Sequence, residues 1–284
     1  MAPNDFAILI NTTDSFEDCW IPFFTLFKKY WPEFNGTIFL NTEKKSFSFC
    51  GLNIVSLQND LNTSNYKPPW SECLLRALDV ISDDIVLYMQ EDYFLHNFVK
   101  SDLVNEFAKL ISISDIGCIQ LTDQATPGPF HSSEHKNLLE IDIKAPYRIS
   151  TQAALWERTV LKQYLIKHET AWQFEVYGTR RARIIQNKIC NVDPSIYGIN
   201  KTEIIPYVFT GIIRGKWNPE IVKLFSIQNL TKDFSLRGIY NSGSQRSLIE
   251  RIIHRLEIRN IIKIVYSILG IYYLKIKSFK FFAF

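Results

Sequence analysis

The chain has 284 residues, of which 46% are hydrophobic, 14% aromatic and 21% charged. A chain of this size can bury a large core, and its mean hydropathy of -0.04 argues against a disordered chain and against a polytopic membrane protein. The net charge of +3 is uneven: residues 246–284 hold four Arg and four Lys against two Glu, a net +6, which leaves −3 for residues 1–245. A charge confined to one end is not typical of a general nucleic-acid-binding protein.

The cysteines and the first residues both favour a cytoplasmic location. Five cysteines, an odd number, form no C-x-x-C pair, which favours free thiols in a reducing compartment. The segment MAPNDFAILI lacks the basic start and the long apolar stretch of a secretory signal peptide. We therefore expect a cytoplasmic protein.

Residues 6–95 predict an alternation of strands and helices. Apolar runs closed by polar turn residues indicate strands, and apolar residues three and four positions apart indicate helices. The expected elements, in chain order, are a strand at 6–11, a helix at 17–30, strands at 37–40 and 53–57, a helix at 71–81 and a strand at 85–89. This order is typical of an α/β domain with a mostly parallel sheet flanked by helices.

The rest of the chain predicts further elements of both kinds. These are a helix at 102–113, a strand at 117–121, a long polar loop at 122–137, a short strand and then an amphipathic helix from about Gln152, a helix from Trp172, and a strand or hairpin at 207–216. Residues 229–247 are rich in Ser, Asn and Gly and indicate a linker. The expected organisation is a main domain at 1–228 and a linker with a basic amphipathic tail at 229–284.

Four of the expected strands are each followed by a polar cluster. The clusters are Thr12-Thr13-Asp14, Asn41-Thr42-Glu43, Gln58-Asn59-Asp60 and Glu91-Asp92. Because ligands of an open parallel α/β sheet gather at the carboxyl ends of its strands, these clusters predict a nucleotide pocket at one edge.

The pair Glu91-Asp92 interrupts the apolar run VLYMQEDYFL at the end of an expected core strand. One interpretation is a strand that ends in solvated charges. The other is a site for Mg²⁺ or Mn²⁺, since these hard cations prefer one or two carboxylates together with phosphate oxygens of a substrate.

The motifs, taken together, resemble those of GT-A glycosyltransferases. Residues 71–95 resemble the nucleotide-sugar part of that superfamily, with Arg76 on its helix and Glu91-Asp92 at its DxD-type acidic motif, here Gln-Glu-Asp. The segment STQAALW at 150–156 resembles the acceptor side, and WQFE at 172–175 with Arg180-Arg181 resembles the acidic helix start of inverting family-two enzymes. Over residues 5–220 the order of motifs is similar to enzymes of bacterial capsule and lipopolysaccharide gene clusters.

The resemblance implies a role for each of these side chains. A divalent cation, Mn²⁺ or Mg²⁺, would be held by Asp92 first and Glu91 second. Glu175 would be the general base, although a Glu near a helix start also simply favours the helix dipole. The residues expected to contact the nucleotide sugar are Thr12, Asp14, Asp60, Arg76 and Arg180. Arg180 and Arg181 suit either pairing with the diphosphate or ordinary surface ion pairs. Trp156 and Trp172 suit either stacking on a sugar or the core.

Two histidines, His131 and His135, stand four residues apart in the loop at 122–137. No third ligand accompanies them, so the loop is expected to face an acceptor rather than to bind zinc.

The tail predicts contact with a membrane surface. Arg251, Arg255, Arg259 and Lys263 recur at every fourth position, and the apolar run Ile264–Leu274 is too short to cross a bilayer, which takes roughly 20 residues. Such a segment suits an anionic membrane interface, here the inner face of the cytoplasmic membrane. The alternative is a helix that packs on the main domain or dimerises, and the oligomeric state stays open.

The resulting expectation is a peripheral membrane glycosyltransferase that uses a nucleoside-diphosphate sugar and a glycan or lipid-linked acceptor. The alternatives are a non-enzymatic membrane-attached scaffold that binds nucleotides or sugars, and a metal-dependent phosphoryl-transfer enzyme. Nucleic acid is not an expected partner.

Overall fold

The computed structural model describes residues 6–59, 66–241 and 258–281, so the predicted ligand Asp60 lies outside the described residues. The chain divides into two compact units, Met1–Phe209 and Thr210–Phe284. A boundary at residue 228 between a main domain and a tail stays a prediction.

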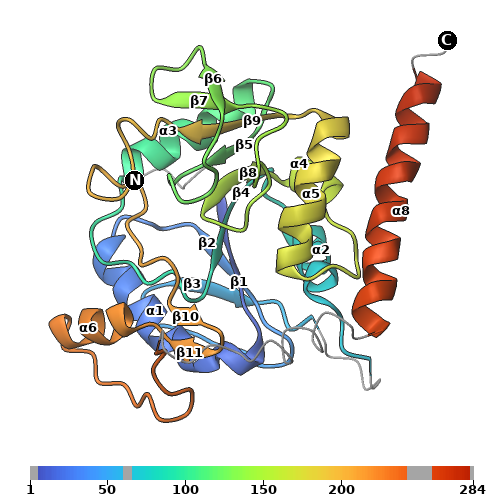
Figure 1. Cartoon of the computed structure of the whole chain (residues 1–284). Helices are drawn as coiled ribbons and strands as arrows, with labels where there is room; N and C mark the ends of the chain where they lie inside the picture. The colour runs from blue at the N-terminus through green and yellow to red at the C-terminus, as the bar shows by residue number, and fades with distance from the viewer. Residues whose placement is uncertain (1–5, 60–65, 242–257, 282–284) are drawn as a thin grey trace. The chain divides into compact units, whose positions relative to one another are not determined.

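The first unit is built on a nine-stranded mixed sheet (Figure 1). Its order is β3-β2-β1-β4-β8-β5-β9-β7-β6. Seven of the nine strands run in one direction, since only β7 and β8 oppose their neighbours. The strands are β1 (Ala7–Asn11), β2 (Thr37–Asn41), β3 (Asn53–Ser56), β4 (Ile85–Gln90), β5 (Ile116–Gln120), β6 (Phe130–Ser132), β7 (Leu138–Ile141), β8 (Ala154–Glu157) and β9 (Lys188–Val192). The predicted α/β class with a mostly parallel sheet is confirmed.

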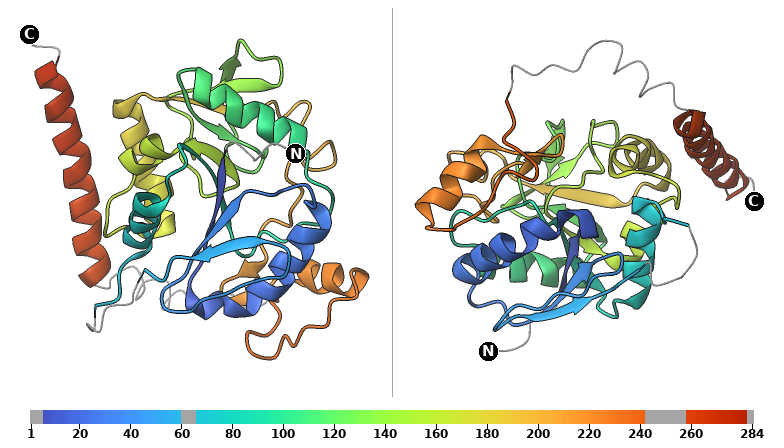
Figure 2. Two further views of the ribbon diagram at one scale, coloured as in Figure 1. Left: turned by 180° about the vertical axis from the view of Figure 1, so that it is seen from behind. Right: turned by 90° about the horizontal axis from the view of Figure 1, so that it is seen from below.

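Five α-helices of this unit flank the sheet, as the views in Figure 2 show. Leu74, Leu78, Val160 and Phe174 bring three of these helices into one buried cluster with Leu9 of β1. The helices are α1 (Glu17–Tyr30), α2 (Trp70–Val80), α3 (Ser101–Ile113), α4 (Arg158–Gln163) and α5 (Ala171–Ile185), with the short 3-10 helix η1 (Asp14–Phe16) before α1. Burying apolar side chains between sheet and helices supplies the main favourable term in folding.

The parallel half of the sheet follows the sequence prediction closely. Strands β3, β2, β1 and β4 are mutually parallel and adjacent. Their carboxyl ends therefore lie at one edge, and the described parts of all four polar clusters follow them there. Because β5 runs in the same direction and β8 in the opposite one, the end of β5 and the start of β8 lie at this edge too.

The second half of the unit differs from the sequence prediction in four places. The helix expected from about Gln152 begins only at Arg158, as α4, because residues 154–157 form β8, between β4 and β5. Backbone hydrogen bonds on both sides and full burial of Leu155 and Trp156 outweigh local helical periodicity here. The loop expected at 122–137 contains β6, and neither β7 nor β9 was predicted.

The second unit contains the predicted late hairpin, made by β10 (Ile212–Ile213) and β11 (Lys216–Trp217). Helix α6 (Pro219–Ile227) follows, and the Asn218 side chain caps it by accepting from the Glu220 amide at 3.0 Å. Trp217 is fully buried against Phe225 and Phe234.

A long helix, α8 (Ile258–Phe281), ends the described chain. Within the described ranges, no helix combines the length and the apolar character needed to cross a membrane.

Candidate functional site

A row of amide side chains joins the carboxyl ends of three strands. The Asn41 Nδ2 donates to the Asn11 Oδ1 at 2.6 Å, and the Asn59 Nδ2 donates to the Asn41 Oδ1. Asn11 and Asn41 are buried. Buried amides that satisfy one another hold these strand ends in a fixed arrangement.

Two predicted nucleotide contacts, Thr12 and Asp14, lie at this edge but already have protein partners. The Thr12 hydroxyl accepts from the Trp20 Nε1 at 2.9 Å. The Asp14 carboxylate accepts from the backbone amides of residues 43, 44 and 45 at 3.0, 3.0 and 3.2 Å. In this structure Asp14 therefore fixes the loop after β2, and a role toward base or ribose stays a prediction.

Arg76 connects the α2 helix with the segment after β3. Its guanidinium donates to the Glu72 carboxylate at 2.7 Å and to the Asn59 carbonyl at 2.5 Å. The structure thus places Arg76 beside the strand-end amides, and its contact with a nucleotide stays a prediction.

Glu91 and Asp92 form the turn that follows β4, and each is only 6% exposed. This burial rules out the interpretation of a solvated strand end. Burial raises the pKa of Tyr88 on β4 well above its usual value, and Glu91, Glu175 and Asp92 add to the rise because each disfavours a charged phenolate. The three acids therefore act on one side chain, which places them in one neighbourhood.

The acidic pair meets the minimum that a hard divalent cation requires. Among the residues that the structure describes, no three His, Cys, Asp or Glu side chains group together as a metal site. One or two carboxylates suffice for Mg²⁺ where substrate phosphate oxygens and water complete its coordination. Asp92 and Glu91 fit that arrangement and do not form an all-protein cage.

Glu175 projects from α5, whose start is fixed by a capping box between Thr170 and Gln173. The Glu175 Oε1 accepts from the Thr151 amide and hydroxyl, both at 2.8 Å, and from the Ser150 hydroxyl at 3.5 Å. No described residue donates to its Oε2. One oxygen is therefore held in place and the other is left for a ligand.

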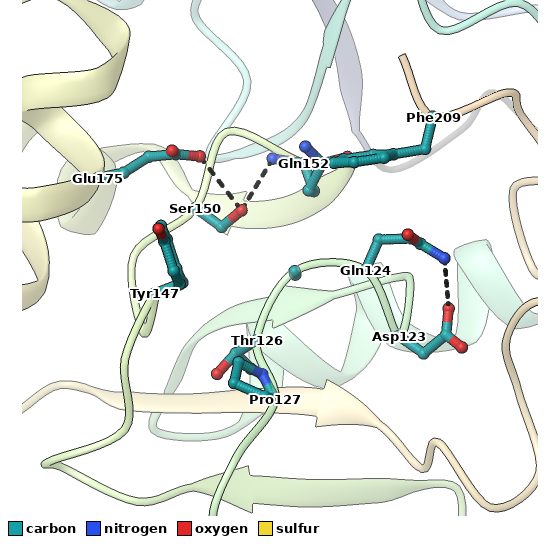
Figure 3. Close-up of a pocket in the computed structure, with 10 residues that line it drawn as sticks. Asp123, Gln124, Thr126, Pro127, Tyr147, Ser150, Gln152, Glu175 and Phe209 are labelled. Atoms are coloured by element: carbon teal, nitrogen blue, oxygen red, sulfur yellow. Dashed lines mark hydrogen bonds between the residues drawn. The ribbon is translucent and has the colours of Figure 1, made fainter. Parts of the chain in front are cut away.

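A cavity of about 500 Å³ lies beside Glu175. Figure 3 shows Glu175 and Tyr147 on one side of it and Asp123 and Gln124 on the other. Ser150 and Gln152, from the segment predicted to line the acceptor side, also face it. Glu91 and Asp92 are not among its described lining residues.

Thr151 connects the acidic end of β4 to Glu175. Its carbonyl accepts from the Tyr93 hydroxyl at 2.9 Å and from the Gln90 Nε2 at 3.4 Å, while its amide binds Glu175. The Tyr93 ring stacks on Tyr207 with 4.5 Å between centroids. The sequence named Thr151 only as part of the acceptor-side segment 150–156, and it missed Tyr93 and Tyr207; Tyr93 stands directly after the acidic pair, which was the one signal for it.

Arg181 does not bind a diphosphate, and the alternative of a surface ion pair is also wrong. Its guanidinium is 1% exposed and forms a two-pronged ion pair with the fully buried Glu169, at 2.8 and 2.6 Å. Arg180, by contrast, is exposed and lies over the Tyr177 ring at 5.4 Å. A diphosphate contact by Arg180 stays a prediction.

The remaining aromatic and histidine candidates lie in different surroundings. Trp156 is buried in the core on β8, whereas Trp172 is 62% exposed. The His131 Nε2 lies 2.7 Å from the Asp142 carboxylate, and His131 belongs to β6. Residues 123–127, from the same predicted loop, do line the cavity.

No family model matches this chain, and no curated protein matches it. Among solved structures it is similar to residues 1–349 of S. aureus TarS, with 14% identity, 66% of this chain and 58% of that chain covered, and a TM-score of 0.43. TarS has also been solved with UDP. The 58% coverage means that this chain spans less than two thirds of the TarS structure of residues 1–349.

Two further structures are similar. One is glucosyl-3-phosphoglycerate synthase from Mycobacterium tuberculosis with Mn²⁺ and UDP-glucose (13% identity, 84% and 80% covered, TM-score 0.42). The other is mannosyl-3-phosphoglycerate synthase from Rubrobacter xylanophilus (10% identity, 79% and 72% covered, TM-score 0.36). At such identities and TM-scores the likeness does not carry the activity of these proteins over to this chain.

Proposed function

We propose that this chain is a GT-A-type glycosyltransferase that moves a sugar from a nucleoside-diphosphate sugar to a glycan or lipid-linked acceptor in bacterial surface polysaccharide synthesis. The observation that carries the proposal is Glu175, whose Oε1 is anchored by Thr151 while its Oε2 is left for a ligand beside a cavity of about 500 Å³. The order of the motifs along the sequence supports it. A two-metal phosphoryl-transfer centre would need more clustered acids than the described residues provide.

In the proposed reaction Glu175 is the general base. An acceptor hydroxyl in the cavity attacks the anomeric carbon of the donor sugar, and its proton passes to the Glu175 Oε2. The new bond forms as the bond from the anomeric carbon to the diphosphate oxygen breaks, and the nucleoside diphosphate leaves with the electron pair. A single attack from the opposite face inverts the anomeric configuration.

Asp92 and Glu91 would hold the divalent cation. When bound, the cation supplies positive charge that offsets the charge developing on the leaving diphosphate. The buried turn after β4 restricts these two side chains, which lowers the ordering cost of binding.

A thermal-shift titration with nucleoside diphosphates tests whether the chain binds the nucleotide part of the proposed donor. At least one nucleotide should raise the melting temperature, more strongly with Mn²⁺ than without it, because ligands that bind only the folded state stabilise it. Release of sugar from the matching nucleotide sugar then tests the reaction. If no nucleotide stabilises the chain with or without Mn²⁺, the glycosyltransferase proposal fails.

Asp92→Asn should remove the metal-dependent part of nucleotide binding. Even outer-shell substitutions cost about 10–100-fold in metal affinity, so loss of a direct ligand should cost at least that much. The measurement is the nucleotide Kd with and without Mn²⁺. The matched control is Asp84→Asn, whose side chain is 88% exposed just before the same strand. Unchanged Mn²⁺ dependence in Asp92→Asn would show that the cation is held elsewhere.

We also propose that α8 attaches the protein to the anionic cytoplasmic face of the membrane. Val265, Leu269, Tyr272 and Ile276 are exposed and recur at spacings of four, three and four, so they share one face of the helix. Lys275 lies over the Tyr272 ring at 5.9 Å. The sequence adds Arg259 and Lys263 within the helix; Arg246, Arg251 and Arg255 lie outside the described residues. An exposed apolar face with Lys275 beside it, in a segment rich in Lys and Arg, suits an anionic interface.

Replacing Val265, Leu269 and Ile276 with Ser should weaken vesicle binding by at least about tenfold, since burying each such side chain is worth roughly 1.5–3 kcal/mol. The measurement is co-sedimentation with phosphatidylcholine vesicles that contain or lack phosphatidylglycerol. The matched control replaces Ile113, Ile227 and Leu236, which are exposed apolar residues outside α8, with Ser. Equal binding by both triple variants would contradict attachment through α8.

A further inference from the structure

The cavity beside Glu175 is lined by acids and not by bases. Asp123 and Glu175 both face it, and none of its described lining residues is Lys, Arg or His. A third acid, Glu203, also interacts with Asp123: burial raises the pKa of Glu203, and the negative charge of Asp123 raises it further. A ligand group in this cavity therefore meets negative charge that no neighbouring cation offsets within the described lining.

Asp123 is held in a fixed position. Its Oδ2 accepts from the Ile199 amide at 3.2 Å, and its Oδ1 accepts from the Gln124 Nε2 at 3.4 Å. It packs against Gly198, where an added Cβ would come within 2.1 Å of the Asp123 Oδ2 and where φ is +149°. These contacts restrain the Asp123 carboxylate beside the cavity, so its negative charge stays close to a bound ligand.

Two aromatic side chains complete the cavity. Tyr147 and Phe209 line it and are each 48% exposed. Tyr147 has a φ of +50°, in the left-handed region that a residue with a Cβ rarely adopts, and the Thr126 hydroxyl holds the preceding carbonyl of Pro146 at 2.7 Å. A strained backbone that presents a half-exposed aromatic ring to a cavity indicates a functional constraint.

We propose that this cavity takes a neutral or amino-bearing sugar of the acceptor and rejects acceptors that carry phosphate or carboxylate at that sugar. Asp123 accepts hydrogen bonds from the sugar's hydroxyl or amino groups, and Tyr147 and Phe209 contact its apolar ring faces. Pockets commonly combine apolar walls with a few fixed polar groups in this way. The inference rests on the proposed glycosyltransferase function and specifies its acceptor.

The test measures sugar binding to the full chain by saturation-transfer NMR, in the absence of a donor. The probes are the methyl glycosides of a neutral hexose, of an amino sugar and of a uronic acid, together with 3-phosphoglycerate. The neutral and amino sugars should bind, and the two anions should bind at least about tenfold more weakly, because like charges close together are strongly unfavourable in a recess. Anions that bind as well as the neutral sugar, or no sugar binding at all, would overturn the proposal.

Two variants separate charge from shape. Asp123→Asn keeps the side-chain shape and should bring the affinity for the anions to within about threefold of that for the neutral sugar, while weakening the amino sugar about tenfold. Phe209→Ala should weaken the neutral sugar about tenfold through lost ring contact. The controls are Asp84→Asn and Phe98→Ala, both exposed and outside the described lining. If Asp123→Asn still binds neutral sugars in preference to anionic ones as strongly as the unaltered chain, the proposed role of the Asp123 charge is contradicted.

Failure of this inference is distinguishable from failure of the proposed function. Nucleotide stabilisation with Mn²⁺ reports on the donor side and does not involve Asp123 or Phe209. Intact nucleotide stabilisation together with strong anion binding would leave the glycosyltransferase standing with a different acceptor.

Discussion

Glu175→Gln should lower kcat for sugar transfer by about 10²–10⁴-fold, the usual contribution of general-base catalysis. Gln keeps an oxygen that can accept from the Thr151 amide and hydroxyl, so the position of the side chain should persist. It cannot take up a proton from an acceptor hydroxyl at neutral pH. The defect should therefore appear in kcat and not in the binding of donor.

The measurement is the initial rate of transfer at saturating nucleotide sugar, together with nucleotide thermal shift on the same sample. Nucleotide stabilisation should equal that of the unaltered chain. The control is Glu220→Gln, at an exposed site in α6. Transfer at the full rate by Glu175→Gln would show that another group takes the proton.

Arg181→Met should lower the free energy of unfolding by about 3–5 kcal/mol, the range for removing one partner of a buried ion pair. Glu169 is fully buried and would lose both hydrogen bonds from the guanidinium. The Tyr164 carbonyl, which accepts from the same guanidinium at 2.6 Å, would lose a donor as well. The measurement is urea unfolding followed by circular dichroism.

Two further variants identify the cause. Arg181→Met combined with Glu169→Gln should be more stable than Arg181→Met alone, because no uncompensated charge remains buried. Lys223→Met breaks an ion pair whose side chains are 67% and 61% exposed, and should change stability by less than about 1 kcal/mol. Equal losses of stability for Arg181→Met and Lys223→Met would mean that burial does not determine how much the Arg181–Glu169 ion pair stabilises the fold.

The sequence predicted the parallel half of the sheet because its signals are local. Each of β1, β2, β3 and β4 is an apolar run closed by polar residues, and the intervening helices carry regular apolar spacing. β8 was mispredicted because its conformation depends on pairing with β4 and β5, which are distant in sequence. A short segment cannot show such partners, and tertiary pairing overrides local propensity.

The residues of the candidate site also differ in whether the sequence alone could predict them. The acids after β4 and at the start of α5 stand in recognisable motifs, so they could be predicted as candidates. Asp123, Tyr147 and Phe209 come from three separate segments, and only folding brings them to one cavity. Arg181 was misread because its charge is visible in the sequence, whereas its burial against Glu169 is not.

The antiparallel strand β8 has a consequence for the order in which the protein can be assembled. β4 pairs with β1 on one side and needs β8, which ends at Glu157, on the other. Until the ribosome has released that residue, β4 presents an unpaired edge, and such edges invite pairing with other chains. The turn that precedes β8 also carries Thr151, so the support for Glu175 forms only when this edge closes. Pairing of β8 with β4 therefore requires the chain to be made at least as far as Glu157, and placement of Thr151 against Glu175 requires it to be made at least as far as Glu175.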